Sequence, residues 1–266
     1  MITGKQKMRI AITGAASGIG AATAALLKKQ GAEIVAFDIV EPKNNVDHWI
    51  DVDMSDPGAI TRAASKATGT FDALLNIAGL PPREGQTAKV LQVNYFGLIA
   101  FTEEMLGKLN KGASIVNLAS RAGSQWRENL DQVKALMSQD NPDHSQLEAF
   151  AADHNVDHIR AYNLTKEAVI VWTMAQTEQM VGMDLRMNSV SPSAVSTGIL
   201  DDFLTAFGER AATAIARAGR PGTADEISAL VAFLASPESG WIKGNDIVMD
   251  GGMSAMAASD ALGLNA

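Results

Sequence analysis

The chain has 266 residues, of which 47% are hydrophobic and 20% charged, a composition typical of folded globular proteins. Its formal net charge of −8 argues against nucleic acid or an anionic membrane as a partner, because both require a positive protein surface. The absence of cysteine excludes disulfides, thiolate zinc sites and cysteine nucleophiles. The sequence also lacks a signal-peptide pattern at its start and any run of roughly 20 apolar residues, so we expect a cytoplasmic protein.

Short β-branched runs alternate with longer alanine- and leucine-rich stretches of helical period, which predicts βαβ units, a parallel sheet and one domain over residues 1–266. The seven predicted strands are Arg9–Thr13, Glu33–Asp38, His48–Asp51, Ala73–Ile77, Ser114–Leu118, Arg186–Val190 and Asp246–Met249. The predicted helices are Ile19–Gln30, Ile60–Lys66, Lys89–Leu109, Arg160–Val181 and Ala224–Leu234. Thr223 and Glu226 form a capping-box pattern at the start of the last helix.

The segment RIAITGAASGIGAATAALL places Gly14, Gly18 and Gly20 between the first strand and the first helix. Glycine in this position allows a tight turn and lets the backbone approach a pyrophosphate at the helix N-terminus. A glycine-rich loop is weak evidence by itself and also fits a tight turn without a ligand. Its place between strand and helix favours dinucleotide binding.

Asp38 ends the second strand, where a carboxylate can accept hydrogen bonds from both ribose hydroxyls of adenosine and would repel a 2′-phosphate. Because no cation accompanies it at Ala15, Ala16 or Ile39, we expect NAD rather than NADP; an ordinary strand-end carboxylate is the alternative. Further along, Asp53–Ser55 is placed to hold the adenine edge, and Asn76–Gly79 ends a strand beside the cofactor. Either segment equally fits a plain strand-to-loop junction.

Two polar residues follow in the middle of the chain. Ser120 ends a buried strand at the sheet edge where open α/β sheets bind ligands, and its hydroxyl can bond a substrate carbonyl. Asn94, on the preceding helix, is placed to hold a water leading toward Lys166, although a helical asparagine is more often an ordinary polar contact.

Tyr162 and Lys166 lie one helical turn apart in a chain with only two tyrosines. Residues i and i+4 share a helix face, so the ammonium of Lys166 is expected to lower the pKa of the Tyr162 phenol and make it an acid–base group. The acidic segment of about residues 124–158, which precedes this pair, is too polar for a sheet strand and is predicted to be a helical insertion.

These pieces together resemble the classical members of the short-chain dehydrogenase/reductase family. The matching segments are TGAASGIG, NIAG, VNYFG, IVNLAS, YNLTK, RMN and DGG, in family order from residue 9 to residue 252. The long insertion and phrases such as KEAVIVWTMAQ and RMNSVSPSAVSTGIL resemble the branch of bacterial 3α-hydroxysteroid dehydrogenase/carbonyl reductase and coniferyl-alcohol dehydrogenase. Ser120 and Tyr162 are 42 positions apart, so the insertion must loop out for their hydroxyls to meet.

The resemblance implies a doubly wound Rossmann fold that uses NAD to interconvert an alcohol with a ketone or aldehyde. It implies a homodimer or homotetramer and no metal. The implied catalytic residues are Ser120, Tyr162, Lys166 and Asn94. The implied cofactor contacts are Gly14, Ser17, Gly18, Ile19, Gly20, Asp38, Asp53, Met54, Asn76, Ala78, Gly79, Tyr162, Lys166, Pro192, Val195 and Thr197. Two departures from the family pattern, Ile77 in NIAG and Ser193 after Pro192, remove no proton carrier.

The sequence says less about the residues that bind the substrate. Residues of about 198–218 form an amphipathic segment that either covers an apolar ligand, such as an aromatic, alicyclic or steroid-like alcohol, or packs as a core-facing helix stripe. Arg121, next to Ser120, either meets a polar substrate group or forms a surface ion pair. His154 and His158 have the spacing of a metal pair but a solvated setting, so a zinc site is not expected. Two other classes remain: an NAD-sensing protein without catalysis, and a methyltransferase, in which the Tyr–Lys pair would have no role.

Overall fold

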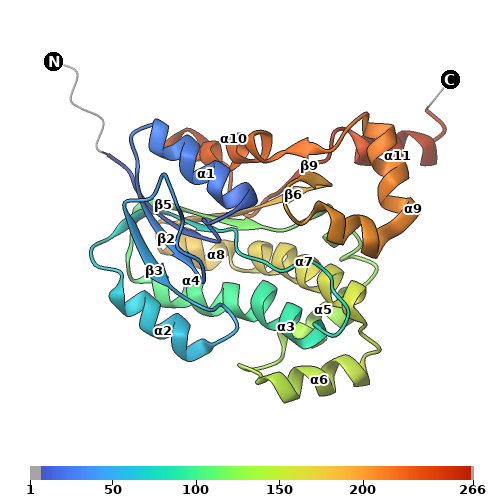
Figure 1. The fold of residues 1–266 in the computed structure, drawn as a ribbon, viewed down its shortest axis with the longest axis horizontal. Helices are drawn as coiled ribbons and strands as arrows, with labels where there is room; N and C mark the ends of the chain where they lie inside the picture. Colours follow the sequence, from blue (N-terminus) through green and yellow to red (C-terminus); the bar gives the residue numbers. More distant parts are fainter. Residues whose placement is uncertain (1–6, 265–266) are drawn as a thin grey trace.

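A parallel sheet of seven strands forms the middle of the computed structural model, which describes residues 7–264 (Figure 1). Within this part of the chain the strand order is β3-β2-β1-β4-β5-β6-β9, so the winding direction reverses between β1 and β4. The strands are β1 (Arg9–Thr13), β2 (Glu33–Asp38), β3 (His48–Asp51), β4 (Phe71–Asn76), β5 (Leu109–Leu118), β6 (Arg186–Pro192) and β9 (Asp246–Met249). All seven predicted strands and the doubly wound α/β class are confirmed; the single domain over 1–266 stays a prediction.

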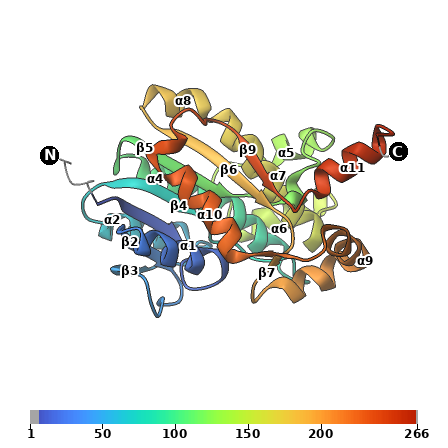
Figure 2. The ribbon, with the colours of Figure 1, turned by 90° about the horizontal axis from the view of Figure 1, so that it is seen from above.

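Helices cover both faces of the sheet because its strands are apolar on both sides. On β1, Ile10 and Ile12 belong to one buried cluster, while Ala11 between them belongs to the other. Figures 1 and 2 show α1 and α10 over one face and α2, α4 and α7 over the opposite face. These helices are α1 (Gly18–Lys29), α2 (Pro57–Lys66), α4 (Leu98–Leu106), α7 (His158–Ala175) and α10 (Ala224–Ala235), the last with the expected capping box.

Two of the predicted helices are interrupted. The predicted helix Lys89–Leu109 divides into α3 (Thr87–Leu91), a π-helical turn η1 (Gln92–Gly97) and α4, and the predicted helix Arg160–Val181 ends as α7 and continues as α8 (Thr177–Gly182). At Gly97 a Cβ atom would lie 2.1 Å from the carbonyl oxygen of Met54, so the two segments pass too closely for a side chain. The π turn contains Asn94, and π turns frequently occur at functional sites.

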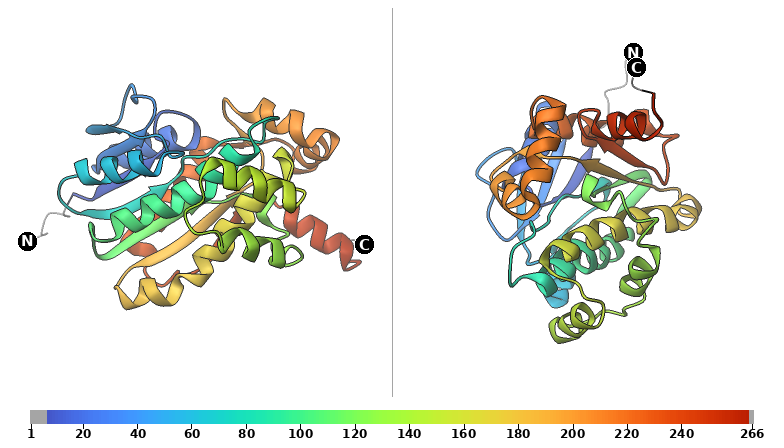
Figure 3. Two further views of the ribbon diagram at one scale, coloured as in Figure 1. Left: turned by 90° about the horizontal axis from the view of Figure 1, so that it is seen from below. Right: turned by 90° about the vertical axis from the view of Figure 1, so that its right-hand side faces the viewer.

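The segment 124–158 loops out of the α/β body as predicted. After the short 3₁₀ turn η2 (Arg121–Gly123) it forms α5 (Leu130–Met137) and α6 (His144–Asp153), which pack against α7 and α3 respectively (Figure 3, yellow-green). Hydrogen bonds hold the insertion to α7: Asn129 donates to the buried Glu167 at 2.8 Å, and Arg160 donates to Gln132 at 2.7 Å. Arg160 and Glu167, both on α7, are fixed by their own two-pronged ion pair at 2.6 and 2.9 Å. The insertion is therefore fixed to the helix that carries Tyr162.

The sequence did not indicate a second sheet of two short strands, β7 (Val195–Ser196) and β8 (Gly222–Thr223). Helix α9 (Leu200–Ala218) lies between these strands in sequence, so their pairing brings both ends of this segment together. The 3₁₀ turn η3 (Pro237–Ser239) follows α10, and α11 (Met253–Ala261) contacts α9 at one end of the molecule (Figure 3). No helix between residues 7 and 264 is long and apolar enough to span a membrane.

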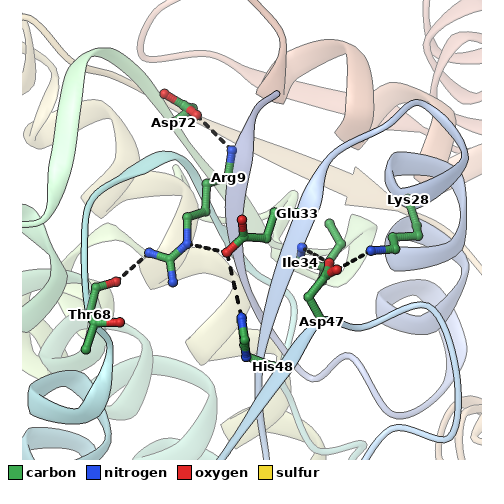
Figure 4. Close-up of polar contacts among 8 residues, drawn as sticks. All are labelled: Arg9, Lys28, Glu33, Ile34, Asp47, His48, Thr68 and Asp72. Atoms are coloured by element: carbon green, nitrogen blue, oxygen red, sulfur yellow. Dashed lines mark hydrogen bonds and ion pairs between the residues drawn. The ribbon is translucent and has the colours of Figure 1, made fainter. Parts of the chain in front are cut away.

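Ion pairs and hydrogen bonds tie the starts of β1, β2 and β3 together (Figure 4). Arg9 bonds Glu33 at 2.7 Å through Nε, and its backbone N–H donates to Asp72 at 2.8 Å. Asp47 pairs with Lys28 and accepts from the backbone N–H of Ile34. Burial acts to raise the pKa of Asp47, but these partners outweigh it and hold the pKa below its usual value. This polar cluster fixes the amino ends of the strands, and the opposite edge carries the residues of the candidate site.

Candidate active site

The glycine-rich loop between β1 and α1 is closed by contacts that only glycine allows. Gly14 has φ +74°, and a Cβ atom there would lie 2.7 Å from the backbone of Ala78; a Cβ atom on Gly20 would lie 1.9 Å from the carbonyl oxygen of Gly14. Helix α1 then begins at Gly18 without a side-chain cap from Ser17, so the first N–H groups of the helix are left for a ligand. The loop therefore fits a pyrophosphate.

Asp38 lies at the end of β2, beside this loop. Its carboxylate accepts hydrogen bonds from the backbone N–H groups of Ala16 at 2.9 Å and Val40 at 3.0 Å, and the indole of Trp49 donates to its carbonyl at 3.0 Å. A cavity of about 310 Å³ opens here and runs toward the end of β4. The predicted cofactor residues that line this cavity are Gly14, Ser17, Gly18, Ile19, Gly20, Asp38, Asp53, Met54, Ala78, Gly79 and Thr197. These residues fit a dinucleotide.

Asn76, also assigned to the cofactor by the sequence, lines neither this cavity nor the neighbouring one. Its buried side chain donates to Thr102 at 2.8 Å and to Asn117 at 2.9 Å. The alternation of side chains along β4 turns this amide toward α4 and β5 instead of the sheet edge. The Asn76 side chain therefore helps to hold the end of β4, which leads directly into Ala78 and Gly79.

A second cavity of about 270 Å³ contains Ser120, Tyr162 and Lys166, and it shares Ile19, Gly79 and Thr197 with the first, among other residues. Ser120 follows the end of β5, where its hydroxyl donates to the carbonyl of Pro192 at 3.5 Å and accepts from the backbone N–H of Ala122 at 3.1 Å. It also lies close enough to the phenol of Tyr162 to act on its pKa. The turn after Ser120 packs directly on α7, because a Cβ atom on Gly123 would lie 2.7 Å from the backbone of Lys166. The two hydroxyls meet beside the cavity that fits a dinucleotide.

The side chains of Lys166 and Asn94 both lie close to Gly79. A Cβ atom on Gly79 would be 3.3 Å from Asn94 Oδ1 and 3.8 Å from Lys166 Nζ, and the lysine donates to the carbonyl of Leu118 at 2.7 Å. The amide of Asn94 is already bound to the backbone of Leu80, accepting its N–H at 2.7 Å and donating to its carbonyl at 2.9 Å. Both ends of the amide are therefore engaged by the backbone of Leu80, and the catalytic role of Asn94 stays a prediction.

The expected lowering of the Tyr162 pKa by Lys166 is not found in this structure. Burial raises the pKa of Tyr162 to about 12, although the neighbouring Ser120 side chain acts in the opposite direction. Lys166 Nζ lies 5.7 Å from the centre of the tyrosine ring and is turned to the Leu118 carbonyl, and burial lowers the pKa of the lysine to about 8. Helical spacing places the two groups on one face of α7, but desolvation has the largest effect on the pKa of both.

Two more predicted cofactor residues, Pro192 and Val195, line the second cavity. Ser193, which stands where the family has glycine, does not adopt a positive φ, and its hydroxyl accepts from the backbone N–H of Ala194 at 2.6 Å. The loop after β6 therefore forms without the freedom of glycine. Among the described residues no group of three or more acidic or histidine side chains is arranged to hold a metal ion.

The segment 198–218 supplies an aromatic wall that sequence alone left undecided. The ring of Phe203 packs edge-on against Tyr162 with 5.2 Å between centroids, and Phe207 is parallel to Phe203 at 6.3 Å. Asp202 makes a two-pronged ion pair with Arg83, both contacts at 2.8 Å, which ties α9 to the loop after β4. No sequence signal indicated this pair, since its members are 119 positions apart.

Comparison with known proteins shows to which family the chain belongs. The model of the short chain dehydrogenase family matches residues 8–131, and that of enoyl-(acyl carrier protein) reductase matches residues 130–254. Coniferyl-alcohol dehydrogenase of Pseudomonas sp. (strain HR199 / DSM 7063) is 37% identical over 92% of this chain and 96% of its own length. The 3-alpha-hydroxysteroid dehydrogenase/carbonyl reductase of Comamonas testosteroni is 28% identical over 93% of this chain and 96% of its own length.

Among solved structures, the 3-alpha-hydroxysteroid dehydrogenase from Pseudomonas sp. B-0831 complexed with NADH superposes with a TM-score of 0.82 at 28% identity, covering 94% of this chain and 98% of that chain. The resemblance predicted from the sequence, including its branch, is confirmed. The chain belongs to the short-chain dehydrogenase/reductase family, in its classical branch, and is an oxidoreductase with a site for a nicotinamide cofactor.

Proposed function

We propose that the protein is an NAD-dependent dehydrogenase/reductase that interconverts an alcohol with a ketone or aldehyde on a bulky apolar substrate. The observation that carries this proposal is the placement of Ser120 and Tyr162 together in the lining of one cavity, open to a substrate and adjoining the cavity that fits a dinucleotide. The names of two relatives, which specify an alcohol and a hydroxysteroid, support it.

The protein side of the reaction is proton transfer and positioning. The bound nicotinamide supplies or accepts the hydride. Ser120 donates a hydrogen bond to the substrate oxygen, and Tyr162 gives its phenolic proton to that oxygen during reduction. With a pKa of about 12 in the free protein, Tyr162 is a phenol at neutral pH, the form that reduction requires. Alcohol oxidation requires the reverse transfer, and Lys166 is the cation in this cavity that can favour the phenolate.

The preference for NAD rests on Asp38. A 2′-phosphate beside this carboxylate would meet a negative charge that is already held in place by the N–H groups of Ala16 and Val40. The neighbouring lining residue Ile39 brings no compensating cation. We infer that the adenosine ribose binds here through its two hydroxyls.

The apolar lining of the substrate cavity supports the proposal of a bulky apolar substrate. Phe203, Phe207, Ile199 and Met253 line this cavity together, and a planar or alicyclic body can pack on the stacked phenyl rings. Of the two interpretations of the segment 198–218, we favour the cover over an apolar ligand. Aromatic, alicyclic and steroid alcohols are the substrate classes to test.

The first prediction concerns turnover. Tyr162→Phe should lower kcat by about 10²- to 10⁴-fold, because it removes the proton carrier while the ring still packs on Phe203. NAD+ reduction at 340 nm with a panel of aromatic, alicyclic and steroid alcohols measures this, and fluorescence titration should show near-normal NADH binding. Tyr95→Phe is the matched control, since the buried Tyr95 lines neither cavity. Silence of the wild-type protein across the panel, with NAD+ bound, would favour the NAD-sensing alternative.

The second prediction concerns the phenol itself. Burial raises the pKa of both tyrosines in the chain, Tyr95 and Tyr162, above the usual value of about 10. Alkaline titration of the ligand-free protein, followed by tyrosinate absorbance at 295 nm, should therefore show no ionisation up to about pH 10. One tyrosine equivalent ionising below pH 9, and missing in Tyr162→Phe, would instead show that Lys166 acidifies the phenol before ligands bind.

The third prediction concerns cofactor choice. The wild-type protein should use NAD+ with a kcat/KM at least about tenfold above that for NADP+, and Asp38→Asn should shrink this ratio by about tenfold because it removes the charge and keeps the size. Paired 340 nm assays with both cofactors give the ratio. Equal use of the two cofactors by the wild-type protein would refute the assignment of Asp38.

The fourth prediction concerns assembly. The outer edge of β9 pairs with no strand among residues 7–264, and Trp241, in the turn leading to it, is 94% exposed, which supports our proposal of a homodimer or homotetramer. Light scattering should give two or four times the monomer mass, and Trp241→Glu should lower it; a monomeric wild-type protein would contradict the proposal. A cytoplasmic location and the exclusion of nucleic acid and membranes stay predictions.

A further inference from the structure

Arg121 occupies a position on the substrate cavity that proton transfer does not use. It follows Ser120 directly, lines the same cavity, and its side chain is 27% exposed. Its Nε atom lies 3.3 Å from Asp250 Oδ2, at the start of the C-terminal segment. The ion pair expected from the sequence therefore exists, but it forms the wall of the substrate cavity.

The carboxylate of Asp250 is satisfied without Arg121. It accepts from the backbone N–H groups of Gly252 at 3.0 Å and Ser254 at 2.8 Å, and from the Ser254 hydroxyl at 2.5 Å. Burial acts to raise the pKa of Asp250, but these bonds and the charge of Arg121 hold it below its usual value. Asp250 is therefore ionised, and its charge cancels that of Arg121.

The hydrogen-bond donors of Arg121, in contrast, have no acceptor. Its Nε atom is buried and makes no hydrogen bond, and its terminal nitrogens donate to no residue within 7–264. Arg83, Arg160 and Arg186 each donate at least two hydrogen bonds from their guanidinium groups. A guanidinium with free donors beside a ligand cavity is a binding group for an acceptor oxygen.

Asn163 provides an independent second observation in the same cavity. It follows Tyr162 on α7 and lines the cavity, and its buried Oδ1 atom also lacks a hydrogen-bond partner. Buried polar atoms without partners are rare and costly in folded proteins. The substrate cavity is therefore lined by two residues with unused hydrogen-bonding capacity, Arg121 and Asn163, together with the apolar side chains of Phe203 and Phe207.

We propose that Arg121 and Asn163 form a recognition site for a second oxygen on the substrate, separate from the reacting alcohol, and that a neutral hydroxyl is the group that satisfies both residues. The hydroxyl accepts from Arg121 and donates to Asn163. A neutral group is favoured over a carboxylate because Asp250 already balances the charge of Arg121. This inference rests on the proposed dehydrogenase function and extends it to substrate choice.

The experiment compares benzyl alcohols in which one ring substituent, at position 3 or 4, is changed between matched groups. Hydroxyl against methyl tests donor and acceptor together, and methoxy against ethyl tests the acceptor alone. In Arg121→Met, the kcat/KM ratio of each oxygen-bearing alcohol to its hydrocarbon match should fall about tenfold from the wild-type ratio. Asn163→Ala should lower the hydroxyl/methyl ratio and leave the methoxy/ethyl ratio in place.

Several controls separate recognition from damage to the fold. Arg127→Met removes an exposed arginine that lines neither cavity and should keep the wild-type ratios. Arg121→Lys, which keeps the charge but loses the planar fork, should give an intermediate ratio and tests the proposal if Arg121→Met does not fold. Ratios that are the same in the wild-type protein and the Arg121 variants would overturn the proposal.

A second readout does not depend on turnover. Binding of 4-methylphenol to the protein with NADH, followed by ligand-detected NMR, should weaken about tenfold in Arg121→Met. If the wild-type protein oxidises no alcohol but this binding still depends on Arg121, the proposed function fails and the recognition site stands. If alcohols are oxidised and the binding is indifferent to Arg121, the recognition site fails alone.

Discussion

The side-chain contact between Ser120 and Tyr162, which line one cavity together, is the contact on which the rest of the site depends. It joins the carboxyl end of β5 to α7 across 42 positions of sequence, and it forms only because the insertion leaves the body of the fold. Gly123 lets the turn after Ser120 rest on the backbone of Lys166, and Asn129 fixes the insertion to α7 through Glu167. Displacing either contact by 1 Å would separate the two hydroxyls from a common substrate oxygen.

Burial sets the chemistry of this pair more than local spacing does. The phenyl rings of α9 and the sheet remove water from Tyr162 and Lys166, which disfavours the charged form of both: the tyrosine stays a phenol and the lysine loses part of its hold on the proton. Desolvation disfavours the charged form of each residue more than the other residue favours it. Because water is largely excluded, few solvent dipoles screen the charge that develops during the reaction. The fixed protein groups around that charge therefore stabilise it more strongly than they would in water.

The sequence correctly predicted the features that local sequence patterns determine. The central strands were recognisable because they are buried on both faces, and the glycine loop because its place between strand and helix is narrowly defined. It assigned Asn76 to the cofactor because strand ends usually face the ligand, whereas this amide bonds Thr102 and Asn117. The π turn at Asn94 and the pair of Arg83 with Asp202 left no signal, because both arise from packing between distant segments.

The polar and apolar walls of the substrate cavity are compatible because the charge of Arg121 is balanced where it stands. An unpaired cation beside Ser120 would favour the Tyr162 phenolate in competition with Lys166 and would bind anions from solution. With Asp250 ionised at 3.3 Å, the pair presents donors without net charge, and the causes that shift the Tyr162 pKa are burial and Ser120 alone. Adjacent residues, 120 and 121, can therefore serve proton transfer and substrate recognition, and the charge of Arg121 does not shift the pKa of Tyr162.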